Sequence, residues 1–318
     1  MDPAQDDARP AVAELPETYW QPPPPEQPRN SPFAVFGILV VVLAIVGGVA
    51  LLGSGSRTIE GHALPAPAGG SNREQAPADG TPGKKAAAVY ELGTNPLLNP
   101  GVGLPQITCR LPAIKRTPEA LREYYQAEVG CLDTAWKAAL EQVNEPFEPT
   151  ELEIEVPSSS ACGAAPSKEE ATAYYCGGDR TIYMPRDRLL EDAGVIQSAH
   201  LALLAHEYAH HVQELSGIMG ALEDKEREIT KGTPEDLELG RRLELQANCF
   251  AGMFIAAAAG RGSVSKSLAD KAMIEFGYVE DSDSHGTRQH QVKWARAGFD
   301  GKHTSACNTW TAPAGDVR

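Results

Sequence analysis

The sequence is short of basic residues: it has 28 Lys and Arg against 43 Asp and Glu, for a formal net charge of −15. Residues 1–30 hold six acids and two arginines, which contributes −4 and leaves −11 for the remainder. Proteins that bind nucleic acids carry basic patches or stripes. The acidic balance therefore argues against a nucleic acid partner, and it carries no information about the fold.

The sequence also lacks a Cys-x-x-Cys pair, the common cysteine signature of a metal site, and no internal repeat is visible. Its six cysteines are Cys109, Cys131, Cys162, Cys176, Cys249 and Cys307. An even number without such a pair favours three disulfides in an oxidising compartment, with buried free thiols as the alternative. A bond between Cys162 and Cys176 would close a loop of about fourteen residues, worth about 3 kcal/mol. Pairing of Cys109 with Cys131 and of Cys249 with Cys307 is a guess.

The first 90 residues are too rich in Pro, Gly and Ala to indicate a folded domain. Within them, residues 33–52 are twenty consecutive uncharged residues, enough to cross a hydrocarbon core of about 30 Å. A signal peptide is the alternative, but the preceding tail is acidic and proline-rich and the apolar run is long for one. We expect a disordered tail at 1–32, a transmembrane helix at 33–53, a flexible linker at 54–88 and one domain at 89–312.

The charges next to the apolar run say little about its orientation, because Arg29 precedes it and Arg57 follows it. The cysteines say more, because all of them follow the run and disulfides persist outside the cytoplasm. We therefore expect a single-pass cell-membrane protein that contacts the lipid bilayer through residues 33–52. Its N-terminus would be cytoplasmic and its catalytic domain extracytoplasmic. No usable signal for an oligomeric state is present.

Helix-start signals and apolar periodicity predict a mainly helical domain with a small sheet, the α+β class. Thr117, Pro118 and Glu119 supply an N-cap, a first-turn proline and a first-turn acid. The helix that follows is long, or is a pair divided at Gly130. Further helices are expected at about 196–215, 233–259, 265–276 and 287–297. Alternation of apolar residues with glutamate predicts a half-buried strand at 151–156, and a second strand is expected at 181–184.

The segment H-E-Y-A-H-H-V-Q carries the chemistry of the chain. His206 and His210 are four residues apart on one helix face, so both imidazoles can reach one ion, and His-Glu-x-x-His is a known metalloprotease signature. Glu207 adjoins the first histidine and can act as general base on a water bound to Zn²⁺. Two ordinary surface histidines are the alternative interpretation. His211 points away from the shared face and is expected to be packed or hydrogen-bonded.

A catalytic zinc site needs a third protein ligand. A metzincin would place Gly and His where this chain has Gln213 and Ser216, so that class is excluded. Most later acids belong to a charged run at 223–228, which is typical of a solvated face or loop. Glu244 differs because it lies in a strongly helical segment with Asn248 one turn later. A surface glutamate balanced by Arg241 and Arg242 is the alternative.

These motifs together resemble the neutral zinc metallopeptidases of bacteria. The resemblance covers about 107–300 and includes the Cys-Gly pair at 162, Y-Y-C-G-G-D-R-T-I-Y-M, H-E-Y-A-H-H-V-Q, E-L-Q-A-N-C-F-A-G and H-G-T-R-Q-H. It implies a zincin-like fold in which Glu244 is the third metal ligand. It also implies a departure, since such sites usually have aspartate where Asn248 stands. Asn248 can still accept a hydrogen bond from a ligand imidazole, but without the charge.

The expected reaction is hydrolysis of a peptide bond in a protein or peptide substrate. The resemblance suggests that the strand at 181–184 is a sheet edge along which an extended substrate lies, with an ordinary strand as the alternative. Candidate donors to the oxyanion are His285, Tyr183, Tyr175 and Tyr208. We favour His285 as the second catalytic residue, because D-S-D-S-H-G-T is a turn that opens a helix. A local capping role is the alternative for His285.

Two other functions stay open at the level of sequence. The domain could hold a structural zinc and act as a scaffold in the cell envelope, with the proline-rich tail docking partners. Retention of Glu207 argues against that hypothesis, because a structural zinc needs no general base. Metal-dependent hydrolysis of a non-peptide amide is the other. The natural substrate and its cleavage site have no signature in the sequence.

Overall fold

Four helices begin directly after a capping Ser or Thr. In the computed structural model, which describes residues 61, 63–64 and 92–318, α2 is Pro118–Gln142, α6 is Pro234–Ala258, α7 is Lys266–Glu275 and α8 is Arg288–Gly301. Each is preceded by a Ser or Thr whose hydroxyl accepts from a backbone N–H of the first turn. The caps are Thr117, Thr233, Ser265 and Thr287.

The predicted long N-terminal helix of the domain is one helix, because α2 passes through Gly130 without a break. The helix predicted at 196–215 is α4, Gln197–Leu215. Several shorter helical pieces were missed: α3 at Arg186–Asp192, α5 at Ile218–Glu226 and 3-10 turns such as η3 at Thr304–Cys307. The charged run at 223–228 lies at the end of α5 and just after it, and most of its side chains are exposed.

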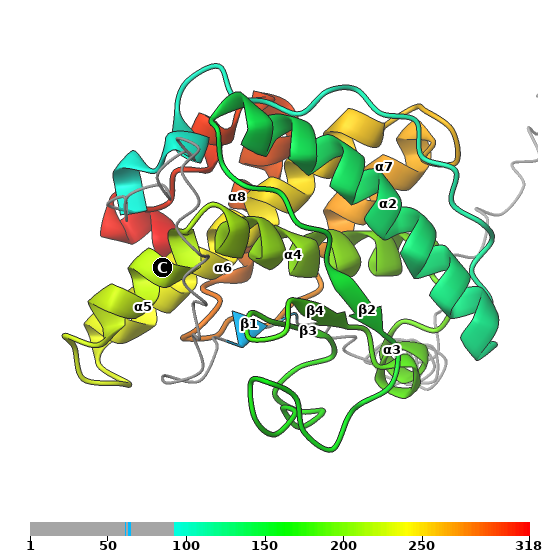
Figure 1. Cartoon of the computed structure of the whole chain (residues 1–318), viewed down its shortest axis with the longest axis horizontal. Helices are drawn as coiled ribbons and strands as arrows, with labels where there is room; N and C mark the ends of the chain where they lie inside the picture. The colour runs from blue at the N-terminus through cyan, green and yellow to red at the C-terminus, as the bar shows by residue number, and fades with distance from the viewer. Residues whose placement is uncertain (1–60, 62, 65–91) are drawn as a thin grey trace, which may run out of the picture. The chain divides into compact units, whose positions relative to one another are not determined.

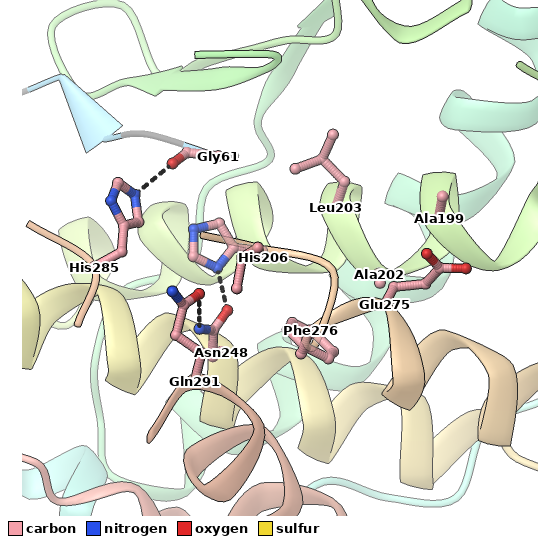
Figure 2. Close-up of a pocket in the computed structure, with 11 residues that line it drawn as sticks. Gly61, Ala199, Ala202, Leu203, His206, Asn248, Glu275, Phe276, His285 and Gln291 are labelled. Atoms are coloured by element: carbon pink, nitrogen blue, oxygen red, sulfur yellow. Dashed lines mark hydrogen bonds between the residues drawn. The ribbon is translucent and has the colours of Figure 1, made fainter. Parts of the chain in front are cut away.

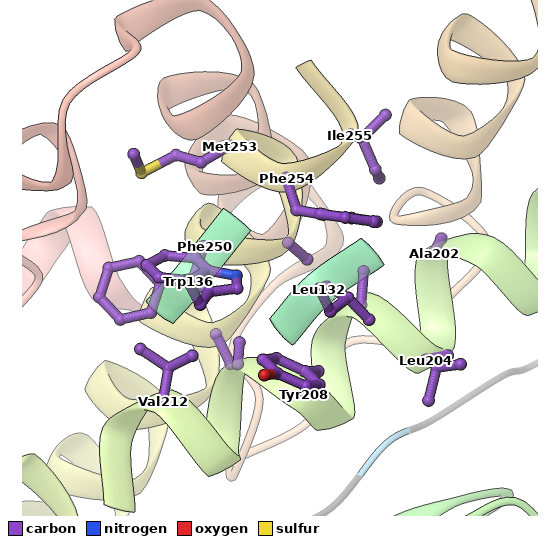
Figure 3. Packing of buried hydrophobic residues seen from close by; sticks show 14 of the residues in the cluster. Leu132, Trp136, Ala202, Leu204, Tyr208, Val212, Phe250, Met253, Phe254 and Ile255 are labelled. Carbon is purple, nitrogen blue, oxygen red and sulfur yellow. The ribbon is translucent and has the colours of Figure 1, made fainter. Parts of the chain in front are cut away.

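The core forms around α4, which runs between α2 and the sheet in Figure 1. Side chains of α2, α4 and α6 interlock there, as Figure 3 shows for Trp136, Tyr208 and Phe250. The rings of Trp136 and Phe250 are 5.0 Å apart between centroids. Full burial of a large apolar side chain contributes about 1.5–3 kcal/mol, so this cluster holds α4 in place from several sides.

Helices α6 and α8 pack with their backbones in contact because each contributes a glycine. A Cβ added at Gly252 would overlap the carbonyl of Ala295, and one at Gly298 would overlap the carbonyl of Cys249. The close approach therefore depends on these two glycines. It places the loop before α8, which carries His285, beside the middle of α6.

A small sheet with the order β1-β3-β4-β2 lies on the other side of α4. The strands are β1 Ala63–Leu64, β2 Glu151–Glu153, β3 Tyr174–Cys176 and β4 Thr181–Tyr183. β3 and β4 are antiparallel, whereas β1 runs parallel to β3 and β2 runs parallel to β4. Mixed helices with a small sheet agree with the predicted α+β class.

Three expectations about strands are corrected. β4 was expected at a sheet edge, but it is internal because β3 and β2 pair with its two sides. β2 ends at Glu153 rather than at residue 156: Met184 N donates to the carbonyl of Glu153 and Arg186 N to that of Ile154, and Val156 beyond them is 42% exposed. β1 falls inside the range expected to be a flexible linker, and β3 was not predicted.

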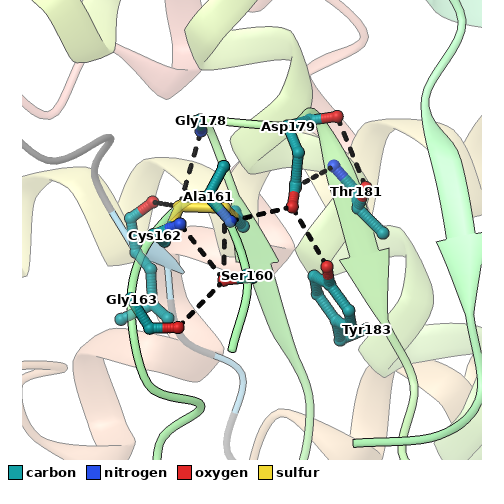
Figure 4. Close-up of a disulfide and its surroundings, with 10 residues drawn as sticks. Ser160, Ala161, Cys162, Gly163, Gly178, Asp179, Thr181 and Tyr183 are labelled. Carbon is teal, nitrogen blue, oxygen red and sulfur yellow. Dashed lines mark hydrogen bonds between the residues drawn. A yellow bond between two sulfur atoms is a disulfide. The ribbon is translucent and has the colours of Figure 1, made fainter. Parts of the chain in front are cut away.

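The cysteines pair as Cys109–Cys131, Cys162–Cys176 and Cys249–Cys307, so the predicted disulfides are confirmed. Figure 4 shows the second bond joining β3 to the preceding loop, where Asp179 accepts from Ala161 N, Thr181 N and the Tyr183 hydroxyl. Among the described residues, no helix is long and apolar enough to cross a membrane. The expected tail at 1–32 and transmembrane helix at 33–53 lie outside the described residues.

Candidate metal centre

Helix α4 presents His206, Glu207 and His210 from a position that is almost wholly enclosed. Their side chains are buried, as are most residues on every face of α4. The helix ends at Leu215. Two residues later Gly217 has a φ of 78°, in the left-handed region that glycine adopts without cost, and Gly217 N donates to the carbonyl of Glu214. The histidines thus lie in the rigid middle of a helix fixed at its C-terminal end.

Glu244 comes from α6 and meets both imidazoles. Its Oε2 lies 3.2 Å from His206 Nε2 and 3.3 Å from His210 Nε2, and the two Nε2 atoms are 3.2 Å apart. The corners of a tetrahedron with Zn–ligand bonds of about 2.0–2.1 Å are roughly 3.3–3.4 Å apart. The three donor atoms therefore have the spacing that one tetrahedral zinc ion requires, and these residues form a group that could hold a metal.

The outer nitrogens of both imidazoles are held by amide oxygens. His206 Nδ1 lies 2.8 Å from Asn248 Oδ1, and His210 Nδ1 lies 2.8 Å from Gln213 Oε1. An amide oxygen only accepts, so each Nδ1 donates to its amide and each ring turns its Nε2 toward Glu244. Three electron-rich atoms then face one point, which is the arrangement that a cation stabilises.

Gln213 is itself fixed by the neighbouring helix. Its Nε2 donates to the carbonyl of Leu243 at 2.9 Å and to Gln246 Oε1 at 3.1 Å, which turns its oxygen toward His210. Gln246 in turn donates to the carbonyl of Cys307 at 3.1 Å. The sequence carries no sign of this role, because a glutamine becomes an orienting group only through contacts between α4 and α6.

The protonation states of the group suit metal binding. Burial lowers the pKa of His206, which keeps the imidazole neutral. Burial on its own would raise the pKa of Glu244, but His210, His285 and His206 outweigh it and hold that pKa well below its usual range. A neutral imidazole and an ionised carboxylate are the forms that bind zinc.

His285 joins the group from the loop between α7 and α8. Its Nε2 lies 3.5 Å from Glu244 Oε2 and donates to the carbonyl of Gly61 at 2.8 Å, while Nδ1 is 2.9 Å from Ser284 Oγ. The other candidate oxyanion donors are engaged elsewhere. Tyr175 contacts His211, Tyr183 donates to Asp179 and Tyr208 donates to Asp133.

A cleft runs from the group along α4 toward the end of α7. Figure 2 shows His206, Asn248 and His285 at one end, with Gly61 beside them. The walls beyond are mainly apolar. They include Ala199, Ala202, Leu203, Phe276 and Val279, with Glu275 and Gln291 as polar members. The cleft can therefore accept an apolar side chain next to the histidines.

The alternative interpretation of Glu244 as a surface acid does not fit this geometry, whereas the expectation for His211 does. Arg241 donates to the carbonyls of Val317 and Asp283, and Arg242 pairs with Glu238, so neither guanidinium contacts Glu244. His211 is packed, as expected: its Nδ1 meets the Tyr175 hydroxyl at 3.1 Å and its Nε2 meets the carbonyl of Glu148 at 2.8 Å. Burial lowers the pKa of His211 to about 3.

Comparison with known proteins agrees with these features. The uncharacterized protein YpfJ of Escherichia coli is 29% identical over 172 residues, which is 48% of this chain and 58% of that protein. The uncharacterized proteins Mb2605 of Mycobacterium bovis and Rv2575 of Mycobacterium tuberculosis are each 27% identical over 179 residues, or 47% of this chain and 59% of theirs. The alignments thus cover less than two thirds of these relatives, and no solved structure matches the chain.

A family model gives the most extensive match. The family described as putative neutral zinc metallopeptidase matches residues 105–310, which is more than half of the chain. That span contains His206, His210 and Glu244 together with α2, α4, α6 and α8. The chain belongs to this neutral zinc metallopeptidase family.

Proposed function

We propose that this chain is a zinc-dependent endopeptidase of the cell envelope, anchored by residues 33–52 with its catalytic domain outside the cytoplasm. The convergence of His206, His210 and Glu244 beside Glu207 carries the catalytic part of the proposal. Three disulfides support the location, because such bonds persist in oxidising compartments. The anchor rests on the length and apolar character of residues 33–52.

Zinc fits the donor set better than the harder divalent cations do. Two imidazoles and one carboxylate are typical catalytic zinc ligands, whereas calcium and magnesium prefer oxygen ligands in larger number. We assign His206, His210 and Glu244 as those ligands, with Asn248 and Gln213 orienting the imidazoles. When bound, zinc supplies a Lewis acid for the scissile carbonyl and lowers the pKa of its water to about 7.

Glu207 is the proposed general base. It adjoins His206 on α4, and its Oε1 faces the backbone of Gly61 in the cleft, close enough that a Cβ at Gly61 would overlap it. From this position the carboxylate can take a proton from the attacking water and return it to the leaving amine. Glu207 is fully buried, so its position depends on α4 rather than on a mobile loop.

His285 is the proposed donor to the carbonyl oxygen that becomes negative. Its Nε2 already donates to a backbone carbonyl, that of Gly61, at 2.8 Å beside the metal-binding group. A positioned donor of this kind stabilises charge that develops during the reaction. The apolar walls of the cleft would receive a substrate side chain next to the cleaved bond.

The test compares the full-length protein with Glu207→Gln, which keeps the shape of the side chain and removes the base. We expect elemental analysis to find one zinc per chain in both. Hydrolysis of a denatured protein mixture should fall about 100- to 10,000-fold in the variant. A His285→Ala variant with full turnover would remove the proposed role of His285.

The experiment also separates the endopeptidase from a scaffold that holds a structural zinc. Zinc with no cleavage in either protein, including forms with Gly61 substituted as described below, would favour the scaffold. Cleavage of small amides without cleavage of peptides would favour a non-peptide amidohydrolase. The position of Glu207 against Gly61, which lines the cleft, supports the hydrolytic function over the scaffold, because a structural zinc gains nothing from a general base.

A further inference from the structure

A short segment that precedes the family match occupies the edge of the sheet. Ala63 and Leu64 pair in parallel with Tyr175 and Cys176, and Gly177 N donates to the carbonyl of Leu64 at 3.1 Å. The side chain of Leu64 packs on an apolar cluster. That cluster consists of Ala171, Tyr174, Cys176 and Tyr183 with Cys162 and Ala165. Because β4 covers the other side of β3, this segment fills the edge that an extended peptide could use.

The same segment reaches the catalytic group through Gly61. This residue is buried, and its carbonyl accepts from His285 Nε2 at 2.8 Å. A Cβ at Gly61 would overlap Glu207 Oε1 and would lie 2.5 Å from His206 Cδ2 and 3.0 Å from His206 Nε2. Real Cβ atoms are essentially never closer than about 3 Å to such atoms. Only glycine therefore fits this position without displacing the segment or the catalytic side chains.

We propose that the segment with Gly61, Ala63 and Leu64 is a tethered ligand of the peptide cleft, which competes with peptide substrates for the β3 edge and for His285. The proposal rests on the endopeptidase function argued above. The segment makes the contacts of a bound peptide: a carbonyl on His285, backbone pairing with β3 and an apolar side chain in an apolar cluster. A ligand that belongs to the same chain binds intramolecularly, with an effective concentration of roughly millimolar for short linkers, so a substrate must compete with it.

The position of Gly61 is that of a competitor rather than of a substrate. The space between its backbone and Glu207 Oε1 is too small for a methyl group, and a water molecule is of similar size. Attack on a bound carbonyl needs a water at the general base. With Gly61 in place, Glu207 is covered, and the segment must leave before a substrate and a water can enter.

Peptide binding tests the occupancy without relying on turnover. The probe is a fluorescein-labelled peptide with the sequence of residues 58–67, TIEGHALPAP. We expect it to bind the full-length Glu207→Gln chain at least tenfold more weakly than the Glu207→Gln, Gly61→Val chain, whose own segment is expelled by the valine. Gly130→Val in the Glu207→Gln background is the matched control, because a Cβ at Gly130 meets nothing within 4 Å.

Hydrolysis of an unrelated labelled peptide tests the competition. In otherwise wild-type full-length chains, kcat/KM should rise at least tenfold in Gly61→Val and stay unchanged in Gly130→Val. Leu64→Asp weakens the same segment at its other end and should raise kcat/KM as well, so a folding defect in one variant leaves the proposal testable. Equal peptide binding and equal kcat/KM in all these forms would overturn the proposal.

The two hypotheses fail in different ways. If Gly61→Val increases peptide binding but no form hydrolyses any peptide, the tethered ligand stands and the endopeptidase function fails. If all forms hydrolyse peptides equally and bind the probe equally, the endopeptidase function stands and the tethered ligand fails. Mass spectrometry of the purified wild-type chain adds one more outcome. If the wild-type chain is cleaved after Gly61 and the Glu207→Gln chain is not, the segment is a substrate of its own active site rather than a competitor. That result would overturn the proposal.

Discussion

The helical side of the cleft and the sheet side are built in different ways. The metal-binding group lies on α4 and α6, helices of 19 and 25 residues that are buried along most of their length. The opposite side consists of strands of two or three residues, held by the Cys162–Cys176 bond and the Asp179 hydrogen bonds. Long packed helices fix atoms to a fraction of an ångström, which catalysis requires, whereas short strands need a cross-link to stay paired.

The two sides also differ in what holds their outermost residues in place. Around the metal-binding group, Gln213 and Gln246 form a chain of amide contacts that ends at the carbonyl of Cys307, and Asn248 joins His206 to Gln291 of α8. On the sheet side, the outer edge of β3 is completed by the distant residues 63–64. We infer that the helical side keeps its form whether or not the cleft is filled, and that the sheet edge changes partners.

The largest effect should come from breaking the helical side at Glu244. In Glu244→Ala, two imidazoles remain without the carboxylate that meets both of them at 3.2–3.3 Å. Zinc affinity should fall by more than the roughly 10- to 100-fold typical of losing an orienting partner, and turnover should vanish with it. Competition with a fluorescent chelator measures the affinity.

The control for that variant is Glu235→Ala, an exposed first-turn acid on the same helix. It should change zinc affinity little and cost at most about 1 kcal/mol of stability through the helix dipole. Equal zinc affinity in Glu244→Ala and Glu235→Ala would show that Glu244 does not bind the metal. The claim that the helical side of the cleft forms the metal site would then fail.

The same contrast explains what the sequence predicts well. The helices begin with local signals: Thr117 caps α2 as predicted, and the helices expected from about 233, 265 and 287 begin one residue after the caps Thr233, Ser265 and Thr287. The four-residue spacing of His206 and His210 fixes their common face through helix geometry alone, and Glu244 follows from the resemblance to the family. Each of these features depends on residues close together in the chain.

The missed features depend on contacts between distant segments. The edge position assigned to β4 was wrong because the strand order is set by which segments meet, and a three-residue strand has no periodicity that shows its neighbours. Gln213 gains its role only when α6 packs on α4. Gly61 and β1 lie in a Pro-, Gly- and Ala-rich range, where composition predicts no order at all.

An intermediate effect should follow from removing the disulfide of the sheet side. Replacing Cys162 and Cys176 by serine opens a 14-residue separation and should lower the free energy of unfolding by about 3 kcal/mol. Zinc affinity should stay the same, because no metal-binding side chain is attached to this loop. Peptide binding should weaken, because the bond holds β3. Urea unfolding and the chelator assay measure the two effects.

The matched comparison is the bond between Cys249 and Cys307 on the helical side. Its separation is 58 residues, so its removal should cost about 4 kcal/mol. Cys249 follows Asn248, and the carbonyl of Cys307 holds Gln246, so this pair should also lower zinc affinity. If both double variants lose zinc equally, the two sides are not independent and the contrast drawn above fails.

The smallest effect is expected at Asn248, where the sequence departs from the aspartate usual in the family it resembles. Asn248→Asp would place a charge 2.8 Å from His206 Nδ1, which strengthens that hydrogen bond and the basicity of Nε2. Gln291, whose oxygen now faces Asn248 Nδ2 at 3.5 Å, must turn its amide to donate instead, which offsets part of the gain. Zinc affinity should therefore stay unchanged or rise by up to about tenfold, with turnover unchanged or higher. Asn248→Ala, which removes the acceptor altogether, should lose about 10- to 100-fold in affinity. Asn248→Asp keeps an acceptor for His206 Nδ1, and Asn248→Ala does not. If both variants lose the same amount of zinc affinity, the acceptor is not what matters. The contact of the Asn248 N–H group with Gln291 would then be what supports the metal-binding group.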